Sequence, residues 1–190
     1  ILPGMDASEI GVSEMIYDCT KDVLEHKERV LYWMRRFWTQ IEGRAKYHDD
    51  SKLKNKAEKN MFDIWTPELK KRMFGSPEYK EALTQMGEGL KLHYKSNRHH
   101  PEHYENGIEG MTLVDIIEMV SDWIAAASAR DTYVDLDKAA ERFGISEQLI
   151  KIIANQLREE DIWNRADNVP VSTLCPPERR SGHIEGFETV

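Results

Sequence analysis

The chain is poor in cysteine and contains no long apolar run. Its 190 residues include two cysteines, Cys19 and Cys175, which are far apart in sequence and do not form a Cys-x-x-Cys pair. This argues against a disulfide scaffold and against a zinc-finger framework. No run of about 18 apolar residues is present, so we expect no membrane-spanning helix and no membrane partner. Residues Ile1 to Gly11 lack the basic and apolar regions of a signal peptide, so we expect a cytoplasmic protein.

Positive charge is in deficit. Lysine and arginine number 26 against 34 aspartates and glutamates, which gives a formal net charge of −8. The overall electrostatic field therefore opposes a polyanion, and we do not expect a nucleic-acid partner. With 32% charged and 40% hydrophobic residues, the composition is that of a folded globular chain, which at this length needs neither disulfides nor an oligomer.

The alternation of apolar and polar residues that marks strands is also missing, and nearly all of the chain has helical periodicity. The sequence therefore predicts an all-α fold. Gly43 is expected to permit a break after the first helix, and Ser76 and Thr112 are expected N-caps. The expected helices cover residues 13–42, 44–54, 77–96, 113–130, 136–143 and 146–160.

The last part of the chain has a different composition. Residues 166–190 are rich in proline, serine, glycine and charge, which predicts an extended or mobile tail. We expect residues 1–165 to form one helical domain.

Histidine is abundant and clustered. Six of the seven histidines lie between His26 and His103, and four of them fall in the eleven residues from His93 to His103. His99 and His100 are adjacent at an expected turn, where neutral imidazoles have no evident structural purpose. Neutral imidazole is a preferred ligand of divalent transition metals, so this cluster predicts a metal site.

Two further histidines precede this cluster. His26 lies on an apolar stripe of the first helix, where a buried histidine bonded to a backbone carbonyl is the ordinary alternative. His48 is followed directly by Asp49. In one unbroken helix, His26 and His48 would lie about 33 Å apart. They can therefore share a metal ion only if the chain reverses between them, for which Gly43 offers a place.

The helix expected at 113–130 is apolar on nearly all sides, which predicts a central and buried position. A buried carboxylate needs a cation, so we take Asp122 as a metal ligand. Asp115 and Glu118 lie on the same stripe as Asp122, and for Asp115 we expect a solvated face.

In this order, the candidate ligands resemble the HD superfamily of metal-dependent phosphohydrolases. That family has a lone histidine, an adjacent His-Asp pair and a distant aspartate, which correspond here to His26, His48-Asp49 and Asp122. The resemblance covers about residues 20–130. It implies an HD-domain helical bundle.

Three segments also resemble the HD-GYP phosphodiesterases. They are the HDxxK motif at His48-Asp49-Asp50-Ser51-Lys52, the double histidine from His99 through Gly107, and the helix segment Val120–Ala126. The NRHHPEH segment recurs in a small HD-like family of bacteria and phages. Two features depart from the pattern: Gly107-Ile108-Glu109-Gly110 replaces the GYP tripeptide, and Ser76-Pro77 replaces a His-Pro.

This resemblance implies a metal-dependent hydrolysis of a small phosphorylated substrate such as a nucleotide. One or two divalent transition-metal ions (Mn, Fe, Co or Zn, with Mg a further candidate) would activate a water molecule. The first ion would be held by His26, His48, Asp49 and Asp122, and Asp49 could bridge to a second ion held by His93, His99 or His100. Asp49 and Lys52 would be catalytic, with Lys52, Arg98 and His103 binding the substrate phosphate.

Two other functions remain open from the sequence. The ligand order also resembles HD-type mixed-valent di-iron oxygenases, such as myo-inositol oxygenase, and spacing does not separate the two chemistries. Residues 136–157 resemble a helix-turn-helix, but its second helix carries Lys151 as the one basic residue of the stretch that would read DNA. We favour the hydrolase, and the sequence names neither its substrate nor its oligomeric state.

Overall fold

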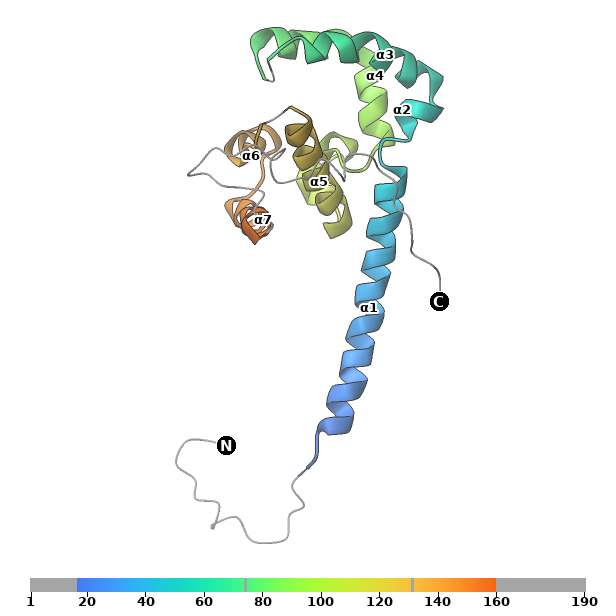
Figure 1. The fold of residues 1–190 in the computed structure, drawn as a ribbon, viewed down its shortest axis with the longest axis vertical. Coiled ribbons are helices and arrows are strands. Elements are labelled where there is room, and N and C mark those ends of the chain that lie inside the picture. The colour runs from blue at the N-terminus through green and yellow to red at the C-terminus, as the bar shows by residue number, and fades with distance from the viewer. Residues whose placement is uncertain (1–16, 74, 131, 160–190) are drawn as a thin grey trace. The chain divides into compact units, whose positions relative to one another are not determined.

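The computed structural model describes residues 17–73, 75–130 and 132–159, and within them the fold is all-α, as predicted. Figure 1 shows the order of the helices along the chain. The longer elements are α1 (Thr20–Tyr47), α3 (Lys56–Lys70), α4 (Pro77–Ser96), α5 (Leu113–Ala129), α6 (Leu136–Phe143) and α7 (Glu147–Glu159). Short elements complete the order: α2 (Ser51–Lys54) and two 3₁₀ turns, η1 (Pro101–His103) and η2 (Gly107–Gly110). None of these helices combines the length and apolarity needed to cross a membrane.

The chain divides into two compact units, of which the first ends at Thr39 and the second begins at Gln40. The single helical domain expected for residues 1–165 stays a prediction. The expected tail at 166–190 lies outside the described residues.

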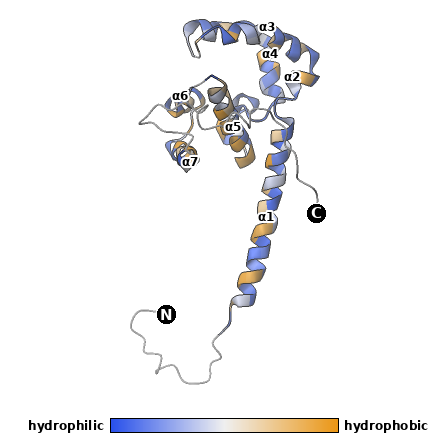
Figure 2. Cartoon of the chain, viewed as in Figure 1, coloured by the Kyte–Doolittle hydropathy of each residue, from blue (hydrophilic) through white to orange (hydrophobic). Residues whose placement is uncertain are grey.

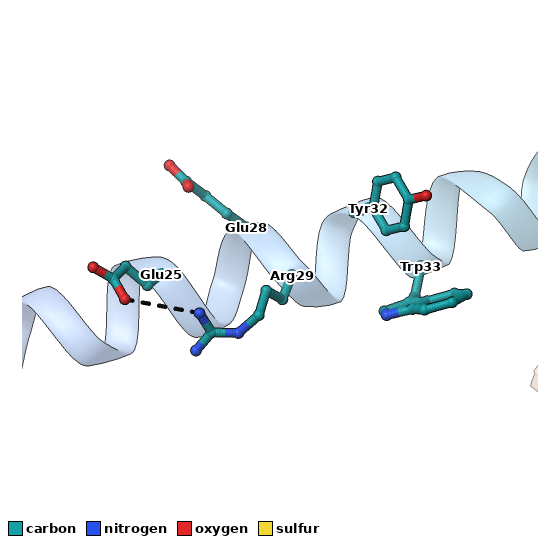
Figure 3. Close-up of a pocket in the computed structure, with 5 residues that line it drawn as sticks. All are labelled: Glu25, Glu28, Arg29, Tyr32 and Trp33. Carbon is teal, nitrogen blue, oxygen red and sulfur yellow. Dashed lines mark ion pairs between the residues drawn. The ribbon is translucent and has the colours of Figure 1, made fainter.

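The first unit contains most of α1. Large apolar side chains on this helix are exposed, and Figure 2 shows apolar residues recurring along it. In Figure 3, Tyr32 and Trp33 project from α1 beside Glu25, Glu28 and Arg29, which together line a shallow hollow. Arg29 pairs with Glu25 at 3.7 Å. Both side chains are exposed, so this ion pair contributes little stability.

The break expected at Gly43 is absent. Helix α1 continues through Gly43 and ends at Tyr47, so no second helix begins at Arg44. A single glycine costs a helix only about 1 kcal/mol, which its flanking turns can offset. The chain reversal that a shared site for His26 and His48 would require therefore does not occur at Gly43.

In the second unit, local capping chemistry fixes where the helices start. The side chain of Asn55 accepts hydrogen bonds from backbone N–H groups of α3, and Ser76 accepts one from Tyr79 N at the start of α4. Thr112 and Asp115 form a reciprocal capping box at the start of α5. The caps predicted at Ser76 and Thr112 are confirmed. Helix α3 packs on α2 and α4, and α4 leads into η1.

The apolar core of the second unit lies where α5, α6 and α7 meet. Gly144 adopts φ 64° after α6, a left-handed conformation that ends the helix and lets α7 fold back. Burial of each large apolar side chain contributes about 1.5–3 kcal/mol, so this core anchors the C-terminal end of α5. The core residues are Ala127, Val134, Leu136, Ile153, Ala154 and Leu157.

Candidate metal centre

The segment that joins α1 to α2 presents His48 and Asp49 together. Asp49 has φ 56°, and it is the one non-glycine residue with positive φ in the described part of the chain. Aspartate tolerates this left-handed conformation better than most residues, but it remains a costly one. Such strained positions occur preferentially at functional sites.

One group of potential ligands gathers around Asp49. It comprises Asp49, His93, His99 and His100, each with a donor atom within 4.8 Å of the others. Asp49 Oδ1 lies 3.7 Å from Nε2 of His93 and 3.7 Å from Nε2 of His99. The Nε2 atoms of His93 and His100 face each other at 2.8 Å. His93 comes from the last turn of α4, and the two other histidines come from the turn that precedes η1.

A second group comprises His48, His99 and Asp122, again with donor atoms within 4.8 Å of one another. Nε2 of His48 lies 3.5 Å from Asp122 Oδ1 and 3.6 Å from Asp49 Oδ2. His99 belongs to both groups. The two oxygens of Asp49 face different groups: Oδ1 faces His93 and His99, and Oδ2 faces His48. Asp49 is therefore placed to bridge two ions.

Two of these donor atoms are buried without a hydrogen-bond partner. They are Asp49 Oδ1 and His99 Nε2, in the part of the chain that the structure describes. A buried polar atom without a partner costs about 1–3 kcal/mol, and more where the group is charged. A divalent cation between the two atoms would satisfy both. The residues present therefore fit a metal ion.

Glu118 orients two of the histidines. Its Oε1 lies 2.9 Å from Nδ1 of His48 and 3.2 Å from Nδ1 of His99. Arg44 Nε donates to Oε2 of the same carboxylate at 2.5 Å. A carboxylate only accepts, so each Nδ1 carries the hydrogen, and each Nε2 is directed toward the candidate metal site.

Glu58 orients the ring of His93 in the same way. Its side chain is fully buried, and Oε1 lies 2.8 Å from Nδ1 of His93. The Ser51 hydroxyl donates to the same oxygen at 2.6 Å. Neither carboxylate was predicted from the sequence to be part of the site. Glu118 could have been found, because it lies one helical turn before Asp122 on one stripe, whereas nothing in the sequence links Glu58 to His93.

The protonation states of His93 and His100 suit a cation. Burial, and then the neighbouring His99 and His93, lower the pKa of His100 to about 2, and burial also lowers the pKa of His93. Both rings are thus neutral, which is the ligand form. Hydrogen bonds to Asp122 and Glu118 raise the pKa of His48 to about 10. A metal ion must therefore displace a proton from His48.

Both candidate ligand carboxyls are ionised. Burial opposes ionisation of Asp49, but the charge and hydrogen bond of Lys52, together with His48 and His93, lower the pKa of that carboxyl. Burial likewise opposes ionisation of Asp122, but the hydrogen bond with His48 and the charges of His99, His48 and Lys52 together lower the pKa of this carboxyl as well.

Lys52 lies three residues after Asp49, in α2, and its side chain reaches back to that residue. Its Nζ donates to Asp49 Oδ2 and lies 4.5 Å from the centroid of the Phe62 ring. The ammonium is half-buried beside the candidate metal ligands. It is therefore placed to neutralise charge on an anionic group bound there.

Asp115 is not on a solvated face, contrary to expectation. Its side chain is 1% exposed and is bound by Arg98, Arg44, Tyr104 and Thr112. Arg98 approaches both carboxylate oxygens, at 3.2 and 3.1 Å. The guanidinium face of Arg98 that was expected to bind a phosphate is therefore occupied by Asp115. A helical wheel cannot show this, because Arg44 comes from α1, 71 residues away in sequence.

Two other predicted site residues lie outside both ligand groups. His103 Nδ1 lies 3.2 Å from the backbone oxygen of Tyr94, so one ring nitrogen already has a partner. His26 is exposed on α1, in the first unit, and the groups gather without it. Of the seven predicted metal ligands, the structure brings together His48, Asp49, His93, His99, His100 and Asp122.

Comparison with known sequences places the chain in a family. Residues 15–159 match the family described as a family of unknown function (DUF5662), which is most of the chain. The chain therefore belongs to that family. Neither the curated proteins nor the solved structures gave a match.

Proposed function

We propose that this member of the DUF5662 family is a metal-dependent phosphohydrolase that acts on a small phosphorylated substrate such as a nucleotide. The observation that carries the proposal is the pair of buried, unpartnered donor atoms, Asp49 Oδ1 and His99 Nε2. Three further histidines and one further aspartate complete the two groups to which these atoms belong. The resemblance to the HD phosphohydrolases supports the reaction type.

The donor set suits one or two divalent transition-metal ions. Mixed imidazole and carboxylate ligands are accepted by Mn, Fe, Co and Zn. When bound, such an ion lowers the pKa of a coordinated water toward neutrality and polarises a phosphoryl oxygen. Asp49 faces both ligand groups and would be shared between two ions.

The chain's own residues supply orientation and charge. Glu118 and Glu58 fix the rings of His48, His99 and His93 through Nδ1, which keeps each Nε2 directed at the site. Lys52 places an ammonium beside Asp49, where it would offset negative charge on the phosphoryl group. Because the chain carries −8 overall, this local positive charge must hold an anionic substrate.

An HD-type di-iron oxygenase is a second candidate. The observation that favours it is the placement of Asp49 between two histidine-rich groups, since a shared carboxylate also suits a pair of irons. An iron-loaded sample that consumes oxygen, together with no phosphate release in Mn²⁺, would favour this reading.

The test is phosphate release from a panel of nucleotides in added Mn²⁺. We expect wild-type activity to disappear in Asp49→Asn, because asparagine tolerates the same backbone conformation but lacks the charge. Asp50→Asn is the matched control, since Asp50 pairs with Lys54 and lies in neither ligand group. Equal rates for wild type and Asp49→Asn would refute the proposed site.

A further inference from the structure

A cavity of about 470 Å³ lies along α3 and the end of α2. Ligand pockets commonly have about 300–1,000 Å³, so this space exceeds what a single phosphate needs. It is lined by Lys52, Leu53, Lys59, Phe62, Asp63, Thr66, Pro67 and Lys70.

Most of this lining is one face of α3. Residues 59, 62, 63, 66, 67 and 70 follow the spacing of three and four that places side chains on one side of a helix. Lys70 comes eleven positions after Lys59, which corresponds to about 16 Å along the helix axis. The cavity is therefore elongated, with a lysine toward each end of the α3 face.

The cavity is positively charged in a negatively charged chain. Its lining has three lysines and one acid, Asp63. Lys59 pairs with Asp63 at 2.6 Å, but both side chains are exposed, so an anion can displace the carboxylate at little cost. Lys70 has no ion pair within the described residues. These features favour an anionic ligand.

Lys52 connects this cavity to the candidate metal centre. Its Nζ donates to Asp49, a member of the ligand group, and lies over the ring of Phe62, which lines the cavity. The Phe62 ring in turn contacts His93 at 5.1 Å between centroids. An anionic group at Lys52 thus has the metal ligands on one side and Lys59 and Lys70 on the other.

We propose that this cavity binds the further phosphoryl groups of a polyphosphate substrate, such as a nucleoside triphosphate. The reacting phosphoryl group lies at Lys52 and the metal centre, and the rest of the chain of phosphates extends toward Lys59 and Lys70. The assignment of the reacting end rests on the proposed function. The binding of polyphosphate to the lysine face of α3 does not.

The first test is calorimetric titration of the metal-stripped full chain with inorganic tripolyphosphate and with orthophosphate. Metal is removed because tripolyphosphate itself binds divalent ions. We expect tripolyphosphate to bind more tightly than orthophosphate, and Lys59→Ala/Lys70→Ala to weaken its binding about tenfold, as loss of charge-assisted contacts does. Lys91→Ala is the control, since Lys91 is an exposed lysine paired with Glu88 on α4. Equal affinity for tripolyphosphate and orthophosphate would overturn the proposal, and so would an unchanged affinity of the double variant for tripolyphosphate.

A second measurement retains the metal and needs no variant. Tripolyphosphate should protect Lys59 and Lys70 of the protein as purified from acetylation, read by mass spectrometry, while Lys91 is modified as before. Equal modification with and without tripolyphosphate would overturn the proposal. Protection of the two lysines without phosphate release from the nucleotide panel would refute the phosphohydrolase and leave the polyphosphate-binding site. Phosphate release without protection would refute the binding site and leave the phosphohydrolase.

Discussion

Nε2 of His99 lies 3.7 Å from Oδ1 of Asp49, and neither atom has a hydrogen-bond partner in the described part of the chain. The two residues are fifty positions apart in sequence, and α2, α3 and α4 lie between them along the chain. Their other polar atoms are bound: Nδ1 of His99 to Glu118, and Oδ2 of Asp49 to Lys52. The fold thus holds two candidate ligand atoms toward each other, and the proposed function depends on a cation between them.

Glu118 should control metal affinity without contacting the metal. Its carboxylate holds the Nδ1 atoms of His48 and His99. Loss of such a partner typically lowers metal affinity 10- to 100-fold, so we expect Glu118→Ala to show this loss. Competition with a chromogenic chelator measures it. Glu141→Ala on α6 is the control, and equal affinity for both variants would show that Glu118 does not orient the ligands.

Lys52 should affect turnover and leave the metal in place. Its ammonium lies beside Asp49 but is not itself a ligand. We expect Lys52→Ala to slow phosphate release by roughly 10²–10³-fold, the effect of one electrostatic stabiliser, with an unchanged metal content. Lys54→Ala removes a lysine of the same helix that pairs with Asp50 and should keep full activity. A similar loss in both variants would contradict the role of Lys52.

Ionisation of Asp115 should make the free energy of unfolding depend on pH in the acidic range. Burial opposes ionisation of this carboxyl, but hydrogen bonds from Arg98, Thr112 and Tyr104 hold its pKa well below the usual range. Its stabilising effect is therefore complete above the unfolded pKa of about 3.9, and it fades as the pH falls below that value. We expect Asp115→Asn to lower the free energy of unfolding by about 3 kcal/mol at pH 7, since it breaks a buried ion pair.

Urea unfolding at pH 7 and at pH 3 measures this difference. The difference in the free energy of unfolding between wild type and Asp115→Asn should be smaller at pH 3 than at pH 7. The exposed Asp63 provides the control, and Asp63→Asn should change stability little at either pH. The same difference in the free energy of unfolding at both pH values would show that the ionised Asp115 carboxylate is not its cause.

His26 should be dispensable for the metal. The resemblance to the HD superfamily makes it a ligand, but the structure gathers both ligand groups without it, and α1 does not reverse at Gly43. We expect His26→Gln to retain the metal stoichiometry of the wild type, and His48→Gln to lower it. Loss of metal from His26→Gln would show that α1 supplies a ligand after all.

Local signals in the sequence predicted much of the fold and part of the site. The caps at Ser76 and Thr112 depend on neighbouring residues, so the sequence alone reveals them. The pairs His48-Asp49 and His99-His100 are also local features. Gly43 was misjudged because a glycine lowers helix stability without deciding where a helix ends.

The partners that complete the site are contacts between distant segments. Glu118 meets His48 across 70 residues, and Glu58 meets His93 across 35. Asp115 has the spacing of a solvated residue on its own helix, and its burial depends on Arg44 from another element. Periodicity describes one helix at a time, so it could not predict any of these contacts.

The most direct test of the account is the metal content of His99→Gln after dialysis against Mn²⁺ or Zn²⁺, measured by plasma mass spectrometry. His99 belongs to both ligand groups, so the account predicts at least one bound ion in the wild type and its loss in this variant. His103→Gln is the matched control, because His103 is nearby but in neither group, and it should keep the metal. A wild type without metal, or equal metal in wild type and His99→Gln, would contradict the account.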